Sequence, residues 1–325
     1  AATEEDVERA EKQAAKARQA MEKASRNAGE QKGKLEAAEA SLMTELEKQL
    51  GLDSKENAEA IARERKAEME QQGHTVYLVE NEVVNISSTQ MRRLLAFRCA
   101  GEFLPEGVLD YIRENRLYDT RTDWKNLPME QLEPIVIRLL NPNRVNHVLG
   151  CRDTAVELAK RWGADETDAA RAGLLHDITK AIDGPLQLTL CEAYGKILSD
   201  FSRKYPKTLH ALTGSLVAER IFGENEEVVS AICHHTTGKA DMTLLQKILF
   251  IADSTEATRR HESCIELRKF FHDNVSDTAP NKLLDRAIIK SIDGTVSYLI
   301  RTGRQVAIDT VKARNYLLKN SEVIK

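Results

Sequence analysis

Single histidine and aspartate residues lie in otherwise apolar helical stretches throughout the C-terminal part of the chain. The most informative are the adjacent His176 and Asp177, which follow the apolar residues 172–175. An imidazole beside a carboxylate is costly to bury unless both groups have partners. Nitrogen and carboxylate-oxygen ligands together favour a divalent transition metal over an all-oxygen calcium site. The predicted metal ligands are His147, His176, Asp177, His210, His235 and Asp253.

Any one of these side chains, taken alone, is more simply explained as a core histidine or a helix-end carboxylate. Their repeated occurrence on apolar faces makes a shared metal centre the better interpretation. Two divalent metals can generate a hydroxide near neutral pH and hold phosphoryl oxygens, as cleavage of a phosphoanhydride requires. Asp177 is the expected bridging ligand and catalytic residue. Lys180, one turn further on, would place positive charge near the phosphates as a catalytic and substrate-binding residue.

Helices are expected to position these ligands, because apolar residues recur at helical spacing through residues 128–325. The predicted fold class is therefore mainly α, with an all-helical domain over 128–325. Residues 1–73 consist largely of Ala, Glu, Lys, Gln and Arg, which predicts a solvated helical extension. Its thin apolar face makes contact with a partner chain, or with a second copy in a homo-oligomer, its expected role.

Residues 74–120 are predicted to form a small α/β segment between these two parts. The β-branched and aromatic residues 75–79 predict a short strand. The polar cluster around Ser87 predicts an N-cap for the helix that follows, and the free amide groups of such a helix start can attract an anion. Arg92 would add a charged fork to that end, although a capped helix of purely structural role is the more common explanation.

Composition excludes several classes of function. A net charge of −4 provides no basic field to gather nucleic acid. No apolar run approaches the ~20 residues that a membrane span needs. Five widely spaced cysteines without a CxxC pair are typical of reduced thiols in a cytoplasmic protein. The expected partner is therefore a nucleotide substrate, with neither nucleic acid nor membrane.

The order of the ligands resembles that of the HD phosphohydrolase superfamily. Residues 235–239 (HTTGK), 244–253 (LLQKILFIAD) and 309–318 (DTVKARNYLL) narrow the resemblance to the bacterial YqeK family. That resemblance implies an iron-dependent hydrolase that cleaves diadenosine tetraphosphate symmetrically to two ADP. It also implies that one metal is held by His147, His176, Asp177 and Asp253, and that His210 and His235 hold a second in members that have one.

The substrate-binding residues are expected to be Lys180, Thr237, Gly238, Arg259 and Arg314. Thr237 and Gly238 could donate a hydroxyl and a backbone N–H. Arg259 and Arg314 stand where the family has arginine. The chain departs from the family pattern at Ala211, His234 and residues 254–257, which are expected at the pocket wall. Those departures bear on substrate preference more than on the ligands.

Residues 86–93 (ISSTQMRR) and 103–112 (FLPEGVLDYI) resemble the C-terminal end of nicotinate mononucleotide adenylyltransferases. The catalytic segment of that family, with its paired histidines, is missing, so this part is interpreted as a structural remnant. YqeK proteins also occur fused behind such an enzyme, which would account for both parts. Two alternatives stay open: another HD nucleotide phosphatase, or a non-catalytic module that binds metal or nucleotide. Manganese is the alternative metal, and one or two ions are compatible with the ligands.

Overall fold

The computed structural model describes residues 55–78, 86–274 and 280–320, and the chain divides into two units after Asn85. In the first unit, helix α2 (Lys55–Gln71) carries solvent-exposed charged side chains, with ion pairs joining Arg65 to Glu68 and Lys66 to Glu70. This agrees with the predicted solvated helix. The rest of the predicted extension, residues 1–54, lies outside the described residues.

The strand expected over residues 75–79 is wrong for the part that the structure describes. Residues 75–78 form no strand, and Val79 lies outside the described residues. A strand requires a second strand to accept its backbone hydrogen bonds. The side chain of Tyr77, within this segment, is 82% exposed. β-propensity without a pairing partner was therefore insufficient here.

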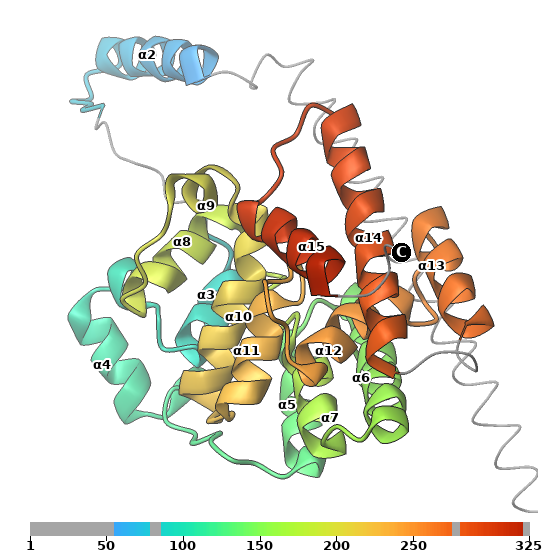
Figure 1. Ribbon diagram of the computed structural model, residues 1–325. Helices are drawn as coiled ribbons and strands as arrows, with labels where there is room; N and C mark the ends of the chain where they lie inside the picture. The colour runs from blue at the N-terminus through green and yellow to red at the C-terminus, as the bar shows by residue number, and fades with distance from the viewer. Residues whose placement is uncertain (1–54, 79–85, 275–279, 321–325) are drawn as a thin grey trace, which may run out of the picture. The chain divides into compact units, whose positions relative to one another are not determined.

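In the second unit, residues 86–325, all the regular secondary structure that is described is helical, which confirms the predicted mainly α fold (Figure 1). None of the helices that the structure describes is long and apolar enough to cross a membrane. The α-helices of this unit are α3 (Ser88–Ala96), α4 (Glu106–Glu114), α5 (Met129–Leu139), α6 (Val145–Trp162), α7 (Glu166–Leu175), α8 (Gly184–Ala193), α9 (Asp200–Lys204), α10 (Leu209–Val217), α11 (Glu226–His234), α12 (Leu244–Thr255), α13 (Glu262–Asp273), α14 (Pro280–Arg301) and α15 (Ile308–Asn320).

Local signals in the sequence set the ends of the helices that later carry the site. Helix α6 ends at Gly163, which takes the left-handed conformation with φ +76°. Helix α7 begins after Asp165, whose side chain accepts the Asp168 amide. Helix α12 begins with a capping box formed by Thr243 and Gln246. These caps satisfy amide and carbonyl groups that helix ends leave without an intrahelical partner.

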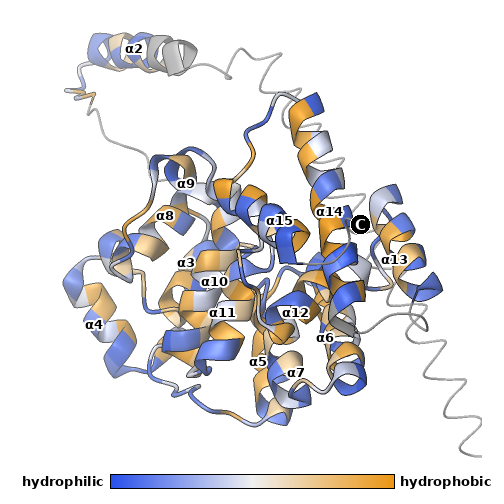
Figure 2. Ribbon diagram, in the orientation of Figure 1, coloured by the Kyte–Doolittle hydropathy of each residue, from blue (hydrophilic) through white to orange (hydrophobic). Residues whose placement is uncertain are grey.

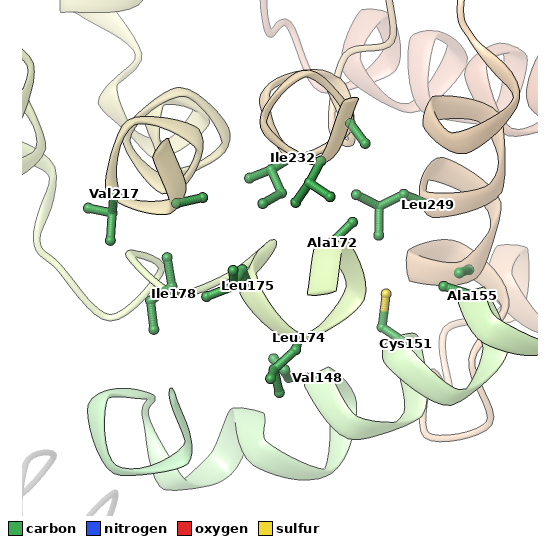
Figure 3. Close-up of a cluster of buried hydrophobic side chains, with 14 of the residues drawn as sticks. Val148, Cys151, Ala155, Ala172, Leu174, Leu175, Ile178, Val217, Ile232 and Leu249 are labelled. Atoms are coloured by element: carbon green, nitrogen blue, oxygen red, sulfur yellow. The ribbon is translucent and has the colours of Figure 1, made fainter. Parts of the chain in front are cut away.

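The core lies among α6, α7, α10, α11 and α12, where their apolar faces meet. Figure 3 shows buried side chains of these helices on both sides of α7: Val148 lies beside Leu174, and Ile232 and Leu249 lie on the side of Ala172. Helices α6 and α7 approach so closely that a Cβ on Gly173 would lie 2.6 Å from the Cα atom of Arg152. Figure 2 shows hydrophobic residues along α10, α11 and α12, within the bundle.

Residues 86–124 pack into the same core as the rest of the second unit. Leu94 and Phe97 of this segment are fully buried, and Trp124 stacks on Phe222 with 5.7 Å between ring centroids. The hydroxyl of Tyr194 donates to the carbonyl of Phe97 over 2.6 Å. Ser87 caps α3 by accepting the Gln90 amide, as predicted.

Candidate metal centre

The six predicted ligands come together at the centre of the helical bundle. His147 lies in α6, His210 in α10 and Asp253 in α12. His176 directly follows α7 and is continued by Asp177, and His235 directly follows α11. Because α6 and α7 pack tightly at Gly173, His147 of α6 lies close to His176 and Asp177 at the end of α7.

One group of ligand atoms consists of His147, His176 and Asp253. Nε2 of His147 lies 3.2 Å from Nε2 of His176 and 3.1 Å from Oδ1 of Asp253. His176 Nε2 lies 3.7 Å from the same Asp253 oxygen. All three atoms lie within 4.8 Å of one another, close enough to share one metal ion.

A second group shares His176 and adds Asp177 and His235, again with all ligand atoms within 4.8 Å. The two oxygens of Asp177 face different histidines. Oδ2 lies 3.5 Å from His176 and 3.7 Å from His147. Oδ1 lies 3.5 Å from His210 and 3.8 Å from His235. The carboxylate of Asp177 therefore connects both sides of the cluster.

Hydrogen bonds fix the orientation of three of the rings. Nδ1 of His176 lies 2.8 Å from the Gly173 carbonyl, and Nδ1 of His235 lies 2.7 Å from the Ile232 carbonyl. A carbonyl can only accept, so Nδ1 must carry the proton in both rings. Nδ1 of His147 faces Oε1 of Glu256 at 3.0 Å in the same way. Each ring thus turns the lone pair of Nε2 toward the cluster.

The electrostatic setting keeps these ligands in the protonation states that a metal requires. Burial lowers the pKa of His235 to about 4 and lowers that of His176 well below its ordinary value, so both rings are neutral. For Asp253, burial alone would raise the pKa. The hydrogen bond with His147 and the charge of Arg259 outweigh that effect, and the pKa falls well below its ordinary value. Neutral imidazoles and an ionised carboxylate are metal-binding forms.

Two functional candidates were missed by the sequence analysis. Glu256 is fully buried, holds His147, and accepts hydrogen bonds from both the amide and the hydroxyl of Thr258. Arg144 is paired with Oδ2 of Asp177, and its buried Nε has no hydrogen-bond partner among the described residues. Two signals were available in the sequence: Glu256 lies one helical turn after Asp253, and Arg144 lies one helical turn before His147.

Lys180 and Arg259, two of the predicted substrate-binding residues, lie beside the cluster. Nζ of Lys180 lies 2.8 Å from Nε2 of His210 and 4.0 Å from Oδ1 of Asp177. Burial, reinforced by the charge of Arg144, lowers the pKa of Lys180 to about 8. Arg259 binds Asp253 twice, through an ion pair to Oδ1 and through Nε to the backbone carbonyl at 2.9 Å.

The other predicted substrate-binding residues, Thr237, Gly238 and Arg314, form hydrogen bonds with residues other than the six ligands. The Thr237 hydroxyl donates to the Gly238 carbonyl over 3.1 Å, and the Gly238 amide donates to the His234 carbonyl over 2.9 Å. Gly238 has φ +67°, which favours glycine, and a Cβ there would lie in tight contact, 3.1 Å from Cβ of Ala313 in α15. Arg314 is paired with Asp293 of α14 and with none of the six ligands.

The residues present fit a divalent metal. The Nε2 atoms of His147 and His176 lie 3.2 Å apart although both turn lone pairs toward the cluster. Two facing lone pairs repel unless a cation or a proton lies between them, and burial disfavours the proton on His176. Imidazole nitrogen with carboxylate oxygen is the donor set of zinc, iron and manganese sites.

Comparison with known proteins agrees with this geometry. The HD domain family matches residues 144–258, a range that contains all six ligands. The symmetrical bis(5'-nucleosyl)-tetraphosphatase of Bacillus subtilis is 31% identical over 193 residues, which cover 59% of this chain and 98% of that protein. The chain belongs to this HD-domain tetraphosphatase family.

A solved structure extends the family likeness to the fold. It is described as an HD superfamily hydrolase involved in NAD metabolism from Clostridium acetobutylicum. It aligns with a TM-score of 0.54 and 34% identity, covering 59% of this chain and 98% of its own. A Mycoplasma pneumoniae protein named a probable nicotinate-nucleotide adenylyltransferase/Ap4A hydrolase is 30% identical over 49% of this chain and 42% of its own length. That name combines the two families that residues 86–112 and 235–318 resemble.

Proposed function

We propose that this HD-domain protein hydrolyses diadenosine tetraphosphate symmetrically, yielding two ADP. The observation that carries the proposal is the convergence of the six predicted ligands, five in two candidate metal-binding groups and His210 beside Asp177, in a member of a family that includes a named symmetrical tetraphosphatase. Net hydrolysis consumes one water: its oxygen bonds to a central phosphorus atom, and the bond to the bridging oxygen breaks. The five free cysteines support the cytoplasmic location that this activity implies.

His147, His176, Asp177 and Asp253 would hold one divalent ion, and His210 and His235 would join Asp177 in holding a second. The metal, iron in this proposal with manganese as the alternative, would polarise the phosphoryl group and lower the pKa of water. Asp177 can orient the attacking water, because its two oxygens face both halves of the cluster. The buried, hydrogen-bonded histidines around Asp177 keep its carboxylate in this orientation.

Arg144, Lys180 and Arg259 would neutralise the polyphosphate. Arg144 and Arg259 pair with Asp177 and Asp253, yet each guanidinium retains further N–H groups for a phosphate oxygen. Lys180, half-exposed beside His210, adds a third cation on the other side of Asp177. Thr237, Gly238 and Arg314 would join the site only by exchanging their present hydrogen bonds for bonds to the substrate.

The size of the cavity between α13 and α14, about 1090 Å³, supports the proposal of a large substrate. Asp253 and Arg259 line it, so it begins at the metal centre, and Phe270 and Tyr298 add aromatic surface further along. Arg286 and Lys290 lie over the Phe270 ring at 5.3 and 5.7 Å. Mixed cationic and aromatic surface is suited to a nucleoside with attached phosphates.

The test is an assay of purified protein with iron or manganese and diadenosine tetraphosphate, with the products separated by chromatography. ADP as the sole product supports the proposal. AMP with ATP would indicate an asymmetric enzyme and overturn it. Phosphate release from nucleoside mono- or diphosphates alone would indicate another HD nucleotide phosphatase. Absence of turnover with metal bound would favour a non-catalytic binding module.

A further inference from the structure

A buried network of polar side chains connects α10 to the turns that follow α7. These turns span residues 176–182 and begin with two of the six ligands. Thr179 of the turns and Thr213 of α10 are both 0% exposed, and Gln187 of α8 is 3% exposed. None of the three is a predicted metal ligand, and none takes part in the chemistry proposed above. Polar groups buried this deeply need a reason to be there.

The network links the backbone of the turns to the backbone of α10. The Thr179 hydroxyl donates to the carbonyl of His210 over 3.0 Å, and its oxygen lies 2.8 Å from the hydroxyl oxygen of Thr213. Oε1 of Gln187 accepts from the Thr213 hydroxyl, and Nε2 of Gln187 donates to the Thr179 carbonyl over 2.7 Å. The contacts thus form a closed circuit that holds Thr179 against α10. A buried polar network whose members are all satisfied makes its surroundings rigid.

The two backbones also approach each other closely at this place. A Cβ on Gly214 of α10 would lie 3.3 Å from the carbonyl oxygen of His176 and 3.6 Å from Oγ1 of Thr179. From another direction, Nε2 of Gln90 in α3 donates to the carbonyl of Ala181 over 2.8 Å. The turns are therefore fixed by α10, α8 and α3 together.

The network joins the two segments that carry Asp177 and His210. Oδ1 of Asp177 lies 3.5 Å from Nε2 of His210. A metal ion requires its ligand atoms within about 0.2 Å of their preferred distances. We propose that Thr179, at the centre of the network, is a positioning residue that sets the spacing of His210 and Asp177 for the second ion. This inference rests on the two-ion centre of the proposed function. The first ion also depends on ligands from α6 and α12, so the second ion is the more sensitive to the network.

The test is titration of the full-length, metal-free protein with manganese, with free manganese followed by electron paramagnetic resonance. The wild type should bind two ions. Thr179→Val keeps the shape of the side chain and removes the hydroxyl. As for other outer partners of metal ligands, its loss should weaken the second ion roughly 10–100-fold and the first ion by less than about threefold. Thr179→Ser keeps the hydroxyl and should restore most of the affinity for the second ion.

Ser215→Ala is the matched control. Ser215 is a buried residue of α10 whose hydroxyl donates to the Leu212 carbonyl of the same helix over 2.7 Å, so both affinities should stay unchanged. Thr213→Val, which breaks the same circuit, should act in the same direction as Thr179→Val and replaces it if that variant does not fold. Thermal unfolding of each metal-free variant checks that the fold is retained.

Equal weakening of both ions, or unchanged binding of the second ion in folded Thr179→Val and Thr213→Val proteins, overturns the proposal. Binding of a single ion by the wild type also overturns it. The titration contains no substrate, so its result is independent of diadenosine tetraphosphate hydrolysis. A wild type that hydrolyses the substrate with one ion would refute the positioning role and leave the proposed function intact.

Discussion

The metal centre and a cavity of about 440 Å³ among α3, α5 and η2 (Leu117–Asp119) are both built from charged side chains of one unit, yet they differ in burial and in the sign of their charges. We call the second one the arginine cavity, because it is lined by Arg92, Arg93, Arg116 and Arg138. In the metal centre, His176 is 0% exposed and Asp177 1%, and histidines alternate with carboxylates. In the arginine cavity, Arg92 and Arg116 are exposed, and Asp119 is the one acidic residue among the lining residues.

This difference decides which of the two sites can hold a metal ion. A small cation needs lone pairs that cannot turn away, and buried rings held at Nδ1 provide them. A guanidinium group has N–H donors and no acceptor, so the exposed arginines of the other cavity provide no metal ligand. Substitutions at the two sites should therefore differ strongly in their effect on metal-dependent hydrolysis.

The largest effect is expected from His176→Ala or Asp177→Ala. His176 belongs to both candidate ligand groups, and the carboxylate of Asp177 faces both halves of the cluster. Each substitution therefore removes a ligand that the two halves share. Bound metal and turnover should both be abolished, as measured by elemental analysis and product chromatography. His272→Ala is the matched control, because His272 is an exposed residue of α13 and is none of the six ligands. A His176→Ala protein with full activity would refute the ligand assignment.

The next largest effect is expected from Gly173→Ala, at the close contact between α6 and α7. Gly173→Ala would place a Cβ 2.6 Å from Cα of Arg152, so α6 and α7 must separate. Overpacking of this kind costs about 1–3 kcal/mol in the free energy of unfolding. Gly294→Ala in α14 meets nothing within 4 Å and should be neutral or slightly stabilising. Denaturant titration of both variants checks this, and equal stability would contradict the close packing.

A smaller effect is expected from Glu256→Gln. The amide keeps the shape but loses the charge that holds Nδ1–H of His147, so the ring is less well fixed. Loss of such an outer partner typically weakens metal affinity by roughly 10–100-fold. Glu262→Gln, at the exposed start of α13, is the control. Competition with a metal chelator measures both affinities, and an unchanged affinity in Glu256→Gln would exclude a positioning role.

A still smaller effect should follow from Arg144→Gln, which leaves all six ligands in place. Loss of hydrogen bonds to phosphate should lower kcat/KM about tenfold while the metal content stays unchanged. Arg203→Gln, an exposed arginine that pairs with Glu192 at 3.6 Å, should leave kcat/KM within about twofold of wild type. Steady-state kinetics with diadenosine tetraphosphate distinguishes these outcomes, and loss of metal in Arg144→Gln would give this arginine a structural role instead.

The smallest effect on hydrolysis is expected from Arg92→Gln with Arg116→Gln. These residues line the arginine cavity and touch none of the six ligands, so kcat/KM should stay within about twofold of wild type. The same steady-state assay measures it. A large loss of turnover in a folded variant would mean that the two sites act as one, and the comparison between them would fail.

The sequence by itself determined the helical class and the ligand types. Apolar residues at helical spacing predicted the bundle, and His147, His176 and Asp253 stood out as polar residues on its buried faces. Both inferences depend on short-range patterns, since the period of a helix and the cost of burying a lone polar group are local properties. The strand over residues 75–79 failed because a strand also depends on a distant partner.

Only the tertiary structure decided which charged residues share a site. Glu256 holds His147 from another helix, and Arg314 is engaged by Asp293. Arg138 of α5 lines the same cavity as Arg116 and pairs there with Asp119. These groupings join residues that lie far apart in the chain. From the sequence alone, an arginine in an ion pair cannot be distinguished from one in a catalytic site or in solvent. The physical reason is that charge acts through space, and only the packing of α3, α5, α6, α12 and α14 sets those distances.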